Sequence, residues 1–208
     1  MMKLVIFDLD DTIVHLAVDW TEVKKEIISL ARKEGISIDP DQHIIPLSNS
    51  VAAAGMKSKL DEIYRRHEAG SVAGKTYAVY PEMIALVREL RNKGVLLGIA
   101  SGNHSRNIEE ILRHLGLGSH FDCIVGRDRV QRNKPDPEQL KTIMGKTRIG
   151  RRFTIFIGDS ESDALAAKAA GVSFFRVEKG GTKDTTELRH AIGLLEGGKD
   201  GAPVRPKR

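Results

Sequence analysis

Short runs of apolar residues alternate with amphipathic segments along most of the chain. Five runs have the length and composition of buried strands, at residues 4–7, 95–100, 123–125, 154–157 and 173–177. Segments with helical spacing lie between them and begin near Pro81, Ser105, Pro137 and Ser162. This alternation predicts an α/β fold with a Rossmann-like, doubly wound parallel sheet of about five strands.

Residues 16–79 interrupt this alternation. Apolar residues recur at helical spacing from Trp20 to Ala31, and further helices are expected at Ile44–Ala54 and Lys57–Arg66. No segment here has the pattern of a strand. We therefore expect a small inserted α-helical cap domain at 16–79, an α/β core domain at 1–15 and 80–195, and a disordered basic tail at 196–208.

Composition and charge exclude several classes of protein. The chain has 208 residues, a formal net charge of +5 and one cysteine, Cys123, which lies in an apolar run and is expected to pack in the core. No apolar stretch is long enough to cross a membrane, and the first strand begins too early for a signal peptide, so we expect a cytoplasmic protein. The tail holds scattered basic residues without interleaved aromatic residues, a pattern that does not favour nucleic-acid binding.

Acidic clusters follow two of the expected strands. Asp8, Asp10 and Asp11 come directly after the first strand, while Asp159 and Asp163 follow the strand that ends at 157. Open α/β sheets place their sites at these strand ends. Carboxylates gathered there repel one another unless a cation neutralises them, and Mg²⁺ is the natural candidate. The alternative for each cluster is a solvated turn or a helix cap.

Two further segments carry groups suited to binding phosphate. Ser101 and Gly102 follow the strand at 95–100 and offer a hydroxyl and a flexible backbone N–H. Lys134 lies in a loop before Pro135, where its ammonium can offset anionic charge. Ser101 could equally cap the following helix, and a loop lysine is commonly just solvated.

The order of these groups resembles that of the haloacid dehalogenase superfamily of aspartate-nucleophile phosphotransferases. The resemblance covers the chain to about residue 180 and rests on four motifs: Asp8-x-Asp10-x-Thr12, Ser101, Lys134, and Gly158-Asp159 with Asp163. The helical insert lies where the phosphoglycolate phosphatase and β-phosphoglucomutase-like subgroup carries its cap. Asp11 departs from the pattern, because many relatives have glycine there.

The resemblance implies a role for each motif residue. Asp8 would be the nucleophile that forms an aspartyl-phosphate, and Asp10 would protonate the leaving alcohol and later activate water. Ser101, Gly102 and Lys134 would bind the phosphoryl group. Mg²⁺ would be held by the residues Asp8, Asp10, Asp159 and Asp163, with the backbone carbonyl serving as the ligand at Asp10.

These roles imply a Mg²⁺-dependent phosphatase of a small phosphorylated metabolite such as 2-phosphoglycolate. A β-phosphoglucomutase-like phosphomutase would use the same aspartyl-phosphate, so the sequence leaves this alternative open. A non-catalytic regulator that binds a phosphorylated metabolite is a further alternative, but Asp8 and Asp10 are both present. Both a monomer and a homodimer are compatible with the sequence.

Overall fold

The computed structural model describes residues 2–178 and 185–195, so the expected tail at 196–208 lies outside the described residues. The chain divides into two compact units. We call Met1–His15 with Tyr77–Arg208 the α/β unit, and Leu16–Thr76 the helical unit.

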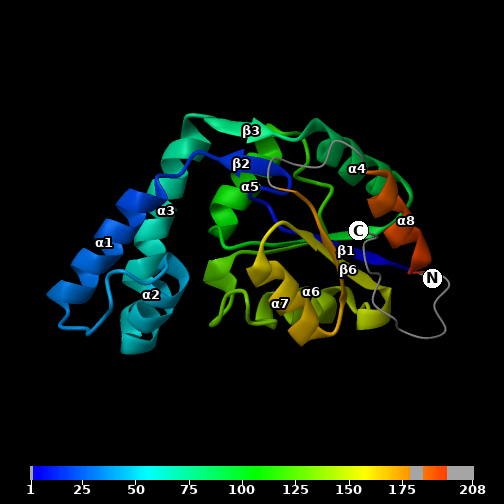
Figure 1. Ribbon diagram of the computed structural model, residues 1–208. Helices are drawn as coiled ribbons and strands as arrows, with labels where there is room; N and C mark the ends of the chain where they lie inside the picture. The colour runs from blue at the N-terminus through cyan, green and yellow to red at the C-terminus, as the bar shows by residue number, and fades with distance from the viewer. Residues whose placement is uncertain (1, 179–184, 196–208) are drawn as a thin grey trace. The chain divides into compact units, whose positions relative to one another are not determined.

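A five-stranded parallel sheet forms the centre of the α/β unit, as the sequence predicts (Figure 1). Its order is β5-β4-β1-β6-β7, with bounds β1 Leu4–Phe7, β4 Leu96–Ala100, β5 Cys123–Val125, β6 Thr154–Gly158 and β7 Ser173–Arg176. The central strand β1 pairs with β4 on one side and β6 on the other, so that Phe7 lies in register with Ile99 and Ile157. This register brings the carboxyl ends of three strands to one edge of the sheet.

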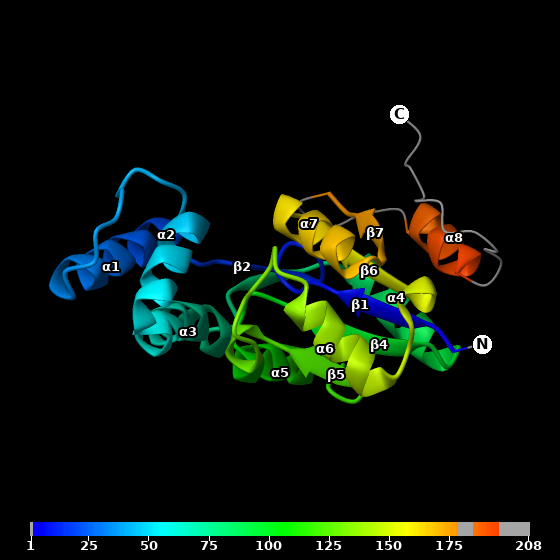
Figure 2. The same cartoon turned by 90° about the horizontal axis from the view of Figure 1, so that it is seen from below.

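Helices cover both faces of this sheet, which explains why β1 is apolar throughout. The helices are α4 Pro81–Asn92, α5 Ser105–His114, α6 Glu138–Thr147, α7 Glu161–Ala170 and α8 Thr186–Leu194. Helices α6 and α7 lie on one face, and α4 and α8 lie on the other (Figures 1 and 2). On the α6 and α7 side, Leu4 and Ile6 pack with Leu140, Phe156 and Ala167 in one apolar cluster.

The helical unit contains three α-helices, which are α1 Trp20–Lys33, α2 Ile44–Val51 and α3 Lys57–Ala73. A π-helical turn, η1 Ala52–Met56, separates α2 from α3, and Gly55 has a φ of 85° at the kink. The apolar faces of the three helices form a separate core of Val23, Ile27, Ala31, Leu47, Val51, Leu60 and Ile63. Among the described residues, no helix combines the length and the apolar character that a membrane span requires.

The sequence predicts no strand between Thr12 and Tyr80, and this prediction is wrong. Strand β2, Val14–Leu16, pairs with β3, Tyr77–Val79, in a two-stranded sheet. Each strand has only three residues, too few for alternation to distinguish a strand from a loop. In β2 the outer residues are buried and the polar central residue, His15, is exposed.

Candidate active site

The predicted site residues come from segments that meet at one edge of the central sheet. Asp8 directly follows β1, Ser101 directly follows β4, and Asp159 directly follows β6. Because these strands are neighbours in register, their ends lie side by side. Lys134 comes from the segment before α6, and Asp163 lies in the first turn of α7.

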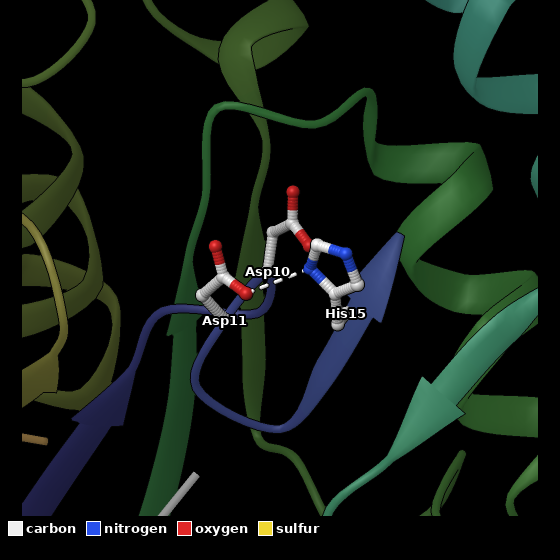
Figure 3. Close-up of side chains that lie close together, drawn as sticks. All are labelled: Asp10, Asp11 and His15. Atoms are coloured by element: carbon white, nitrogen blue, oxygen red, sulfur yellow. Dashed lines mark hydrogen bonds and ion pairs between the residues drawn. The ribbon is translucent and has the colours of Figure 1, made fainter. Parts of the chain in front are cut away.

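Asp11 and His15 form a side-chain contact that the sequence does not predict. His15 Nδ1 lies 2.7 Å from Asp11 Oδ1, and the Tyr80 hydroxyl donates to the same oxygen at 3.5 Å. Figure 3 shows the imidazole beside the side chain of Asp10. Burial raises the pKa of Tyr80, and the nearby carboxylates of Asp11 and Asp10 raise it further, so this hydroxyl remains a proton donor.

Asp8, Lys134 and Asp163 form a buried charge cluster. Lys134 Nζ lies 2.9 Å from Asp8 Oδ1 and 2.6 Å from Asp163 Oδ1, and the lysine side chain is only 8% exposed. Burial raises the pKa of Asp8 to about 7, although Lys134 opposes this shift. Burial would lower the pKa of Lys134, but Asp163 and Asp8 outweigh it and raise that pKa above its ordinary value. Lys134 is therefore a fixed cation beside the candidate nucleophile.

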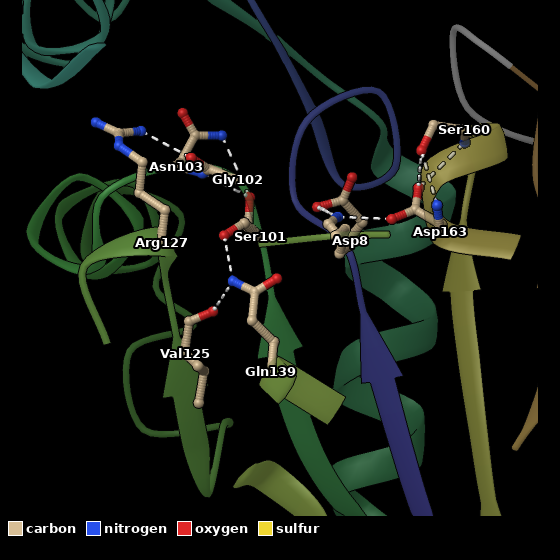
Figure 4. Close-up of polar contacts among 10 residues, drawn as sticks. Asp8, Ser101, Gly102, Asn103, Val125, Arg127, Gln139, Ser160 and Asp163 are labelled. Carbon is tan, nitrogen blue, oxygen red and sulfur yellow. Dashed lines mark hydrogen bonds and ion pairs between the residues drawn. The ribbon is translucent and has the colours of Figure 1, made fainter. Parts of the chain in front are cut away.

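Asp163 is held at the start of α7 by a reciprocal cap. Ser160 Oγ accepts from the Asp163 backbone N–H at 3.1 Å, and Asp163 Oδ2 accepts from the Ser160 backbone and hydroxyl groups at 3.1 and 2.6 Å (Figure 4). Gly158 is needed beside it, since a Cβ there would come within 2.6 Å of Asp163 Oδ2. Both carboxylate oxygens of Asp163 therefore already have protein partners.

The backbone after β4 is fixed by buried side chains. Gln139 Nε2 donates to the carbonyl oxygens of Ser101 and Val125 at 2.8 and 3.0 Å, and Arg127 Nη1 donates to the Gly102 carbonyl oxygen at 2.7 Å (Figure 4). The Ser101 hydroxyl accepts from the backbone and side-chain nitrogens of Asn103. These contacts hold the segment that directly follows β4 in place.

The alternative that Ser101 caps the following helix is wrong. The N-cap of α5 is His104, whose side chain accepts from the Arg106 backbone N–H at 3.2 Å. Ser101 lies three residues earlier and is 1% exposed. Its hydroxyl is thus not used to begin the helix.

The acidic residues fit a magnesium ion. Carboxylate oxygens of Asp8, Asp159 and Asp163 all lie within 4.8 Å of one another. Hard oxygen donors in this arrangement are the ligands that Mg²⁺ prefers. Within this group, Asp163 also accepts from Ser160 and Lys134, and Asp8 also accepts from Lys134.

Comparison with known proteins identifies the family. The model of the family described as haloacid dehalogenase-like hydrolase matches residues 5–177. The chain belongs to this family. Phosphoglycolate phosphatase of Pseudomonas fluorescens (strain Pf0-1) is 31% identical over 182 residues, which cover 82% of this chain and 67% of that protein. Phosphoglycolate phosphatase of Cereibacter sphaeroides (strain ATCC 17029) is 30% identical, with 83% and 84% covered.

Solved structures of haloacid dehalogenase proteins share the fold. CbbY from Rhodobacter sphaeroides in complex with phosphate superposes with a TM-score of 0.61 at 17% identity and covers 86% of this chain and 87% of that one. A haloacid dehalogenase superfamily hydrolase of subfamily IA from Geobacter sulfurreducens gives a TM-score of 0.57 at 22% identity, with 92% and 100% covered. The family and the sequence relatives together identify the chain as a phosphatase enzyme.

Several residues around the site were not found from the sequence. Gln139 and Arg127 are buried side chains that contact residues distant in the sequence, and Ser160 caps α7. Asp11 and His15 are four residues apart, a spacing that indicates a contact on a helix but not in the turn found here. Ser160 carried a readable signal, since serine followed three residues later by an acid is typical of a helix start.

Proposed function

We propose that this phosphatase hydrolyses a small phosphomonoester, of the 2-phosphoglycolate class, through an aspartyl-phosphate on Asp8 with Mg²⁺ as cofactor. The observation that carries the proposal is the placement of Asp8. It lies buried at the end of the central strand, 2.9 Å from the ammonium of Lys134 and next to further carboxylates. A buried carboxylate held beside a fixed cation is suited to attack an anionic phosphoryl group.

The reaction would proceed in two steps. In the first, an Asp8 carboxylate oxygen bonds to phosphorus while the bond to the leaving oxygen breaks, and Asp10 donates a proton to that oxygen. In the second, water bonds to phosphorus and gives its proton to Asp10, and the bond to Asp8 breaks to release inorganic phosphate. Asp10 is partly exposed and follows Asp8 by two residues, so it can exchange this proton with the leaving alcohol and with water.

The remaining residues would bind and orient the phosphoryl group. The Ser101 hydroxyl and the Gly102 backbone N–H would hold its oxygens, and Lys134 would offset its charge. Mg²⁺, when bound by Asp8, Asp159 and the Asp10 carbonyl, would supply further positive charge. Asp163 would keep Lys134 and the start of α7 in place, because its two oxygens bind Lys134 and Ser160.

The helical unit would act as a cap that controls which substrate enters. Its basic residues on α3 are paired with carboxylates of the same unit: Lys57 with Asp61, Lys59 with Glu34, Arg65 with Glu62 and Arg66 with Glu26. These pairs favour a solvated helix face over a substrate contact. The 2-phosphoglycolate class therefore rests on the relatives that carry this name.

Phosphate release from purified enzyme tests the proposal. 2-Phosphoglycolate, sugar phosphates and nucleotides are compared with Mg²⁺ and with EDTA. We expect Mg²⁺-dependent release that Asp8→Asn abolishes and that Asp10→Asn lowers by about 10²- to 10⁴-fold. Asp41→Asn, at an exposed carboxylate of the helical unit, is the matched control and should change nothing. Release that survives Asp8→Asn, or no release from any compound, would contradict the proposal.

A further inference from the structure

We propose that His15, oriented by Asp11, determines specificity by binding a carboxylate of the substrate beside the leaving oxygen. This inference rests on the proposed function and deepens it. It gives a residue of β2 the role of binding the leaving group, and none of the motif residues has that role. The substrate class would be phosphate esters of 2-hydroxycarboxylic acids.

The position of His15 is fixed by its neighbours. Val14 and Leu16 on either side of it are buried, with exposed fractions of 0% and 1%, whereas the His15 side chain is 54% exposed. The strand therefore cannot turn without exposing apolar side chains. Its imidazole is held by Asp11 through Nδ1, so the opposite nitrogen, Nε2, is directed away from that contact (Figure 3).

Asp11 has a geometry that fits a positioning role. Its φ is 57°, in the left-handed region that residues other than glycine seldom occupy. Its carboxylate binds both His15 and the Tyr80 hydroxyl, and these contacts hold the residue in that conformation. A side chain kept at such a site is an indication of function, since glycine would fit the backbone more easily.

Distance places His15 next to the proposed proton donor. One ligand atom each from Asp10, Asp11 and His15 lie within 4.8 Å of one another. Asp10 would contact the leaving oxygen. A group one carbon from that oxygen would therefore come within reach of the imidazole, and a carboxylate there is the defining feature of 2-hydroxycarboxylic acid phosphates.

The negative charge around the site explains why a substrate carboxylate needs a hydrogen-bond donor there. Asp8, Asp10, Asp11, Asp159 and Asp163 gather at this edge of the sheet, and a substrate carboxylate would be repelled by them. Lys134 already lies between Asp8 and Asp163, on the side of the phosphoryl group. A protonated imidazole donates from both ring nitrogens, so His15 in that form binds Asp11 through Nδ1 and presents Nε2 as a second donor on the opposite side of the ring.

The test compares 2-phosphoglycolate with ethyl phosphate, in which a methyl group replaces the carboxylate. His15→Asn keeps a polar group near the position of Nδ1 but lacks Nε2. We expect it to lower kcat/KM for 2-phosphoglycolate by about tenfold or more, mainly through KM, and to affect ethyl phosphate much less. His15→Lys should restore part of the preference for the carboxylate. Asp11→Gly, which suits the positive φ, should weaken the preference by freeing His15.

The control is His190→Asn on α8, an exposed histidine of the same unit, which should leave both rates unchanged. Equal losses for both substrates in His15→Asn, or an unchanged preference, would overturn the inference while phosphate release by the wild-type enzyme still supports the proposed function. No release of phosphate from either compound by wild-type enzyme would overturn the proposed function, and this inference with it.

Discussion

Removing the charge of the candidate nucleophile should make the protein more stable. Asp8 is 7% exposed, and burial raises its pKa from 3.8 to about 7 despite the opposing effect of Lys134. At a pH between these two pKa values, Asp8 has lost its proton in the unfolded chain but keeps it in the folded protein. The folded state therefore loses stability as the pH rises from about 4 to 7, since stability falls wherever the unfolded state binds fewer protons.

The magnitude follows from the same pKa. Each tenfold change in an equilibrium constant corresponds to about 1.4 kcal/mol, so ionising Asp8 in the folded protein costs about 4 kcal/mol at most. Asp8→Asn keeps the shape of the side chain and removes this cost. We expect it to raise the free energy of unfolding by about 2–4 kcal/mol at pH 8 and by less than about 1 kcal/mol at pH 4.

Urea unfolding in EDTA, followed by circular dichroism at pH 4, 6 and 8, measures this difference. The m value is the slope of the unfolding free energy against urea concentration. An unchanged m value would show that the substitution changes stability and not the surface exposed on unfolding. Asp41→Asn, at an exposed carboxylate, serves as the control and should be neutral at each pH. A gain in stability that does not depend on pH, or a loss at pH 8, would refute the reasoning.

Three further predictions follow from the contacts around the site. Lys134→Met leaves the Asp8 and Asp163 carboxylates without their shared cation and should cost about 3–5 kcal/mol in urea unfolding at pH 8. Gly158→Ala forces Asp163 to move and should lower the free energy of unfolding by about 1–3 kcal/mol. The same substitution should cost less in a protein that already carries Asp163→Ala. Ser101→Ala should weaken inhibition by inorganic phosphate by about tenfold, and it should also cost about 1–3 kcal/mol in urea unfolding because the buried nitrogens of Asn103 lose their acceptor. Equal inhibition would argue against the phosphate contact of Ser101.

The arrangement of the sheet could be predicted because its signals are local. Each buried strand is a continuous apolar run, and the polar residues that follow the runs mark the strand ends, so the meeting of Asp8, Ser101 and Asp159 at one edge follows from parallel alternation. The sequence could predict that the positive charge of Lys134 would offset anionic charge at the site. It could not predict that Lys134 lies between two carboxylates. That contact depends on how the loop before α6 folds back over the strand ends.

Other features could not be predicted because they depend on contacts between distant segments. The buried contacts from Gln139 and Arg127 to the backbone after β4 join residues 25 to 38 positions apart. Strands β2 and β3 are too short to show a period. Because β2 could not be predicted, the contact between Asp11 and His15 could not be predicted either. The cytoplasmic location, the oligomeric state and the roles assigned to the motif residues stay predictions.

Identification of the covalent intermediate tests the central claim most directly. Enzyme turning over 2-phosphoglycolate with Mg²⁺ is quenched in acid and digested, and its peptides are analysed by mass spectrometry. The account predicts a phosphorylated peptide that contains Asp8, with the phosphate on that carboxylate and absent from Asp8→Asn. Rapid phosphate release without any phosphorylated Asp8 peptide, or with the phosphate on another residue, would contradict it.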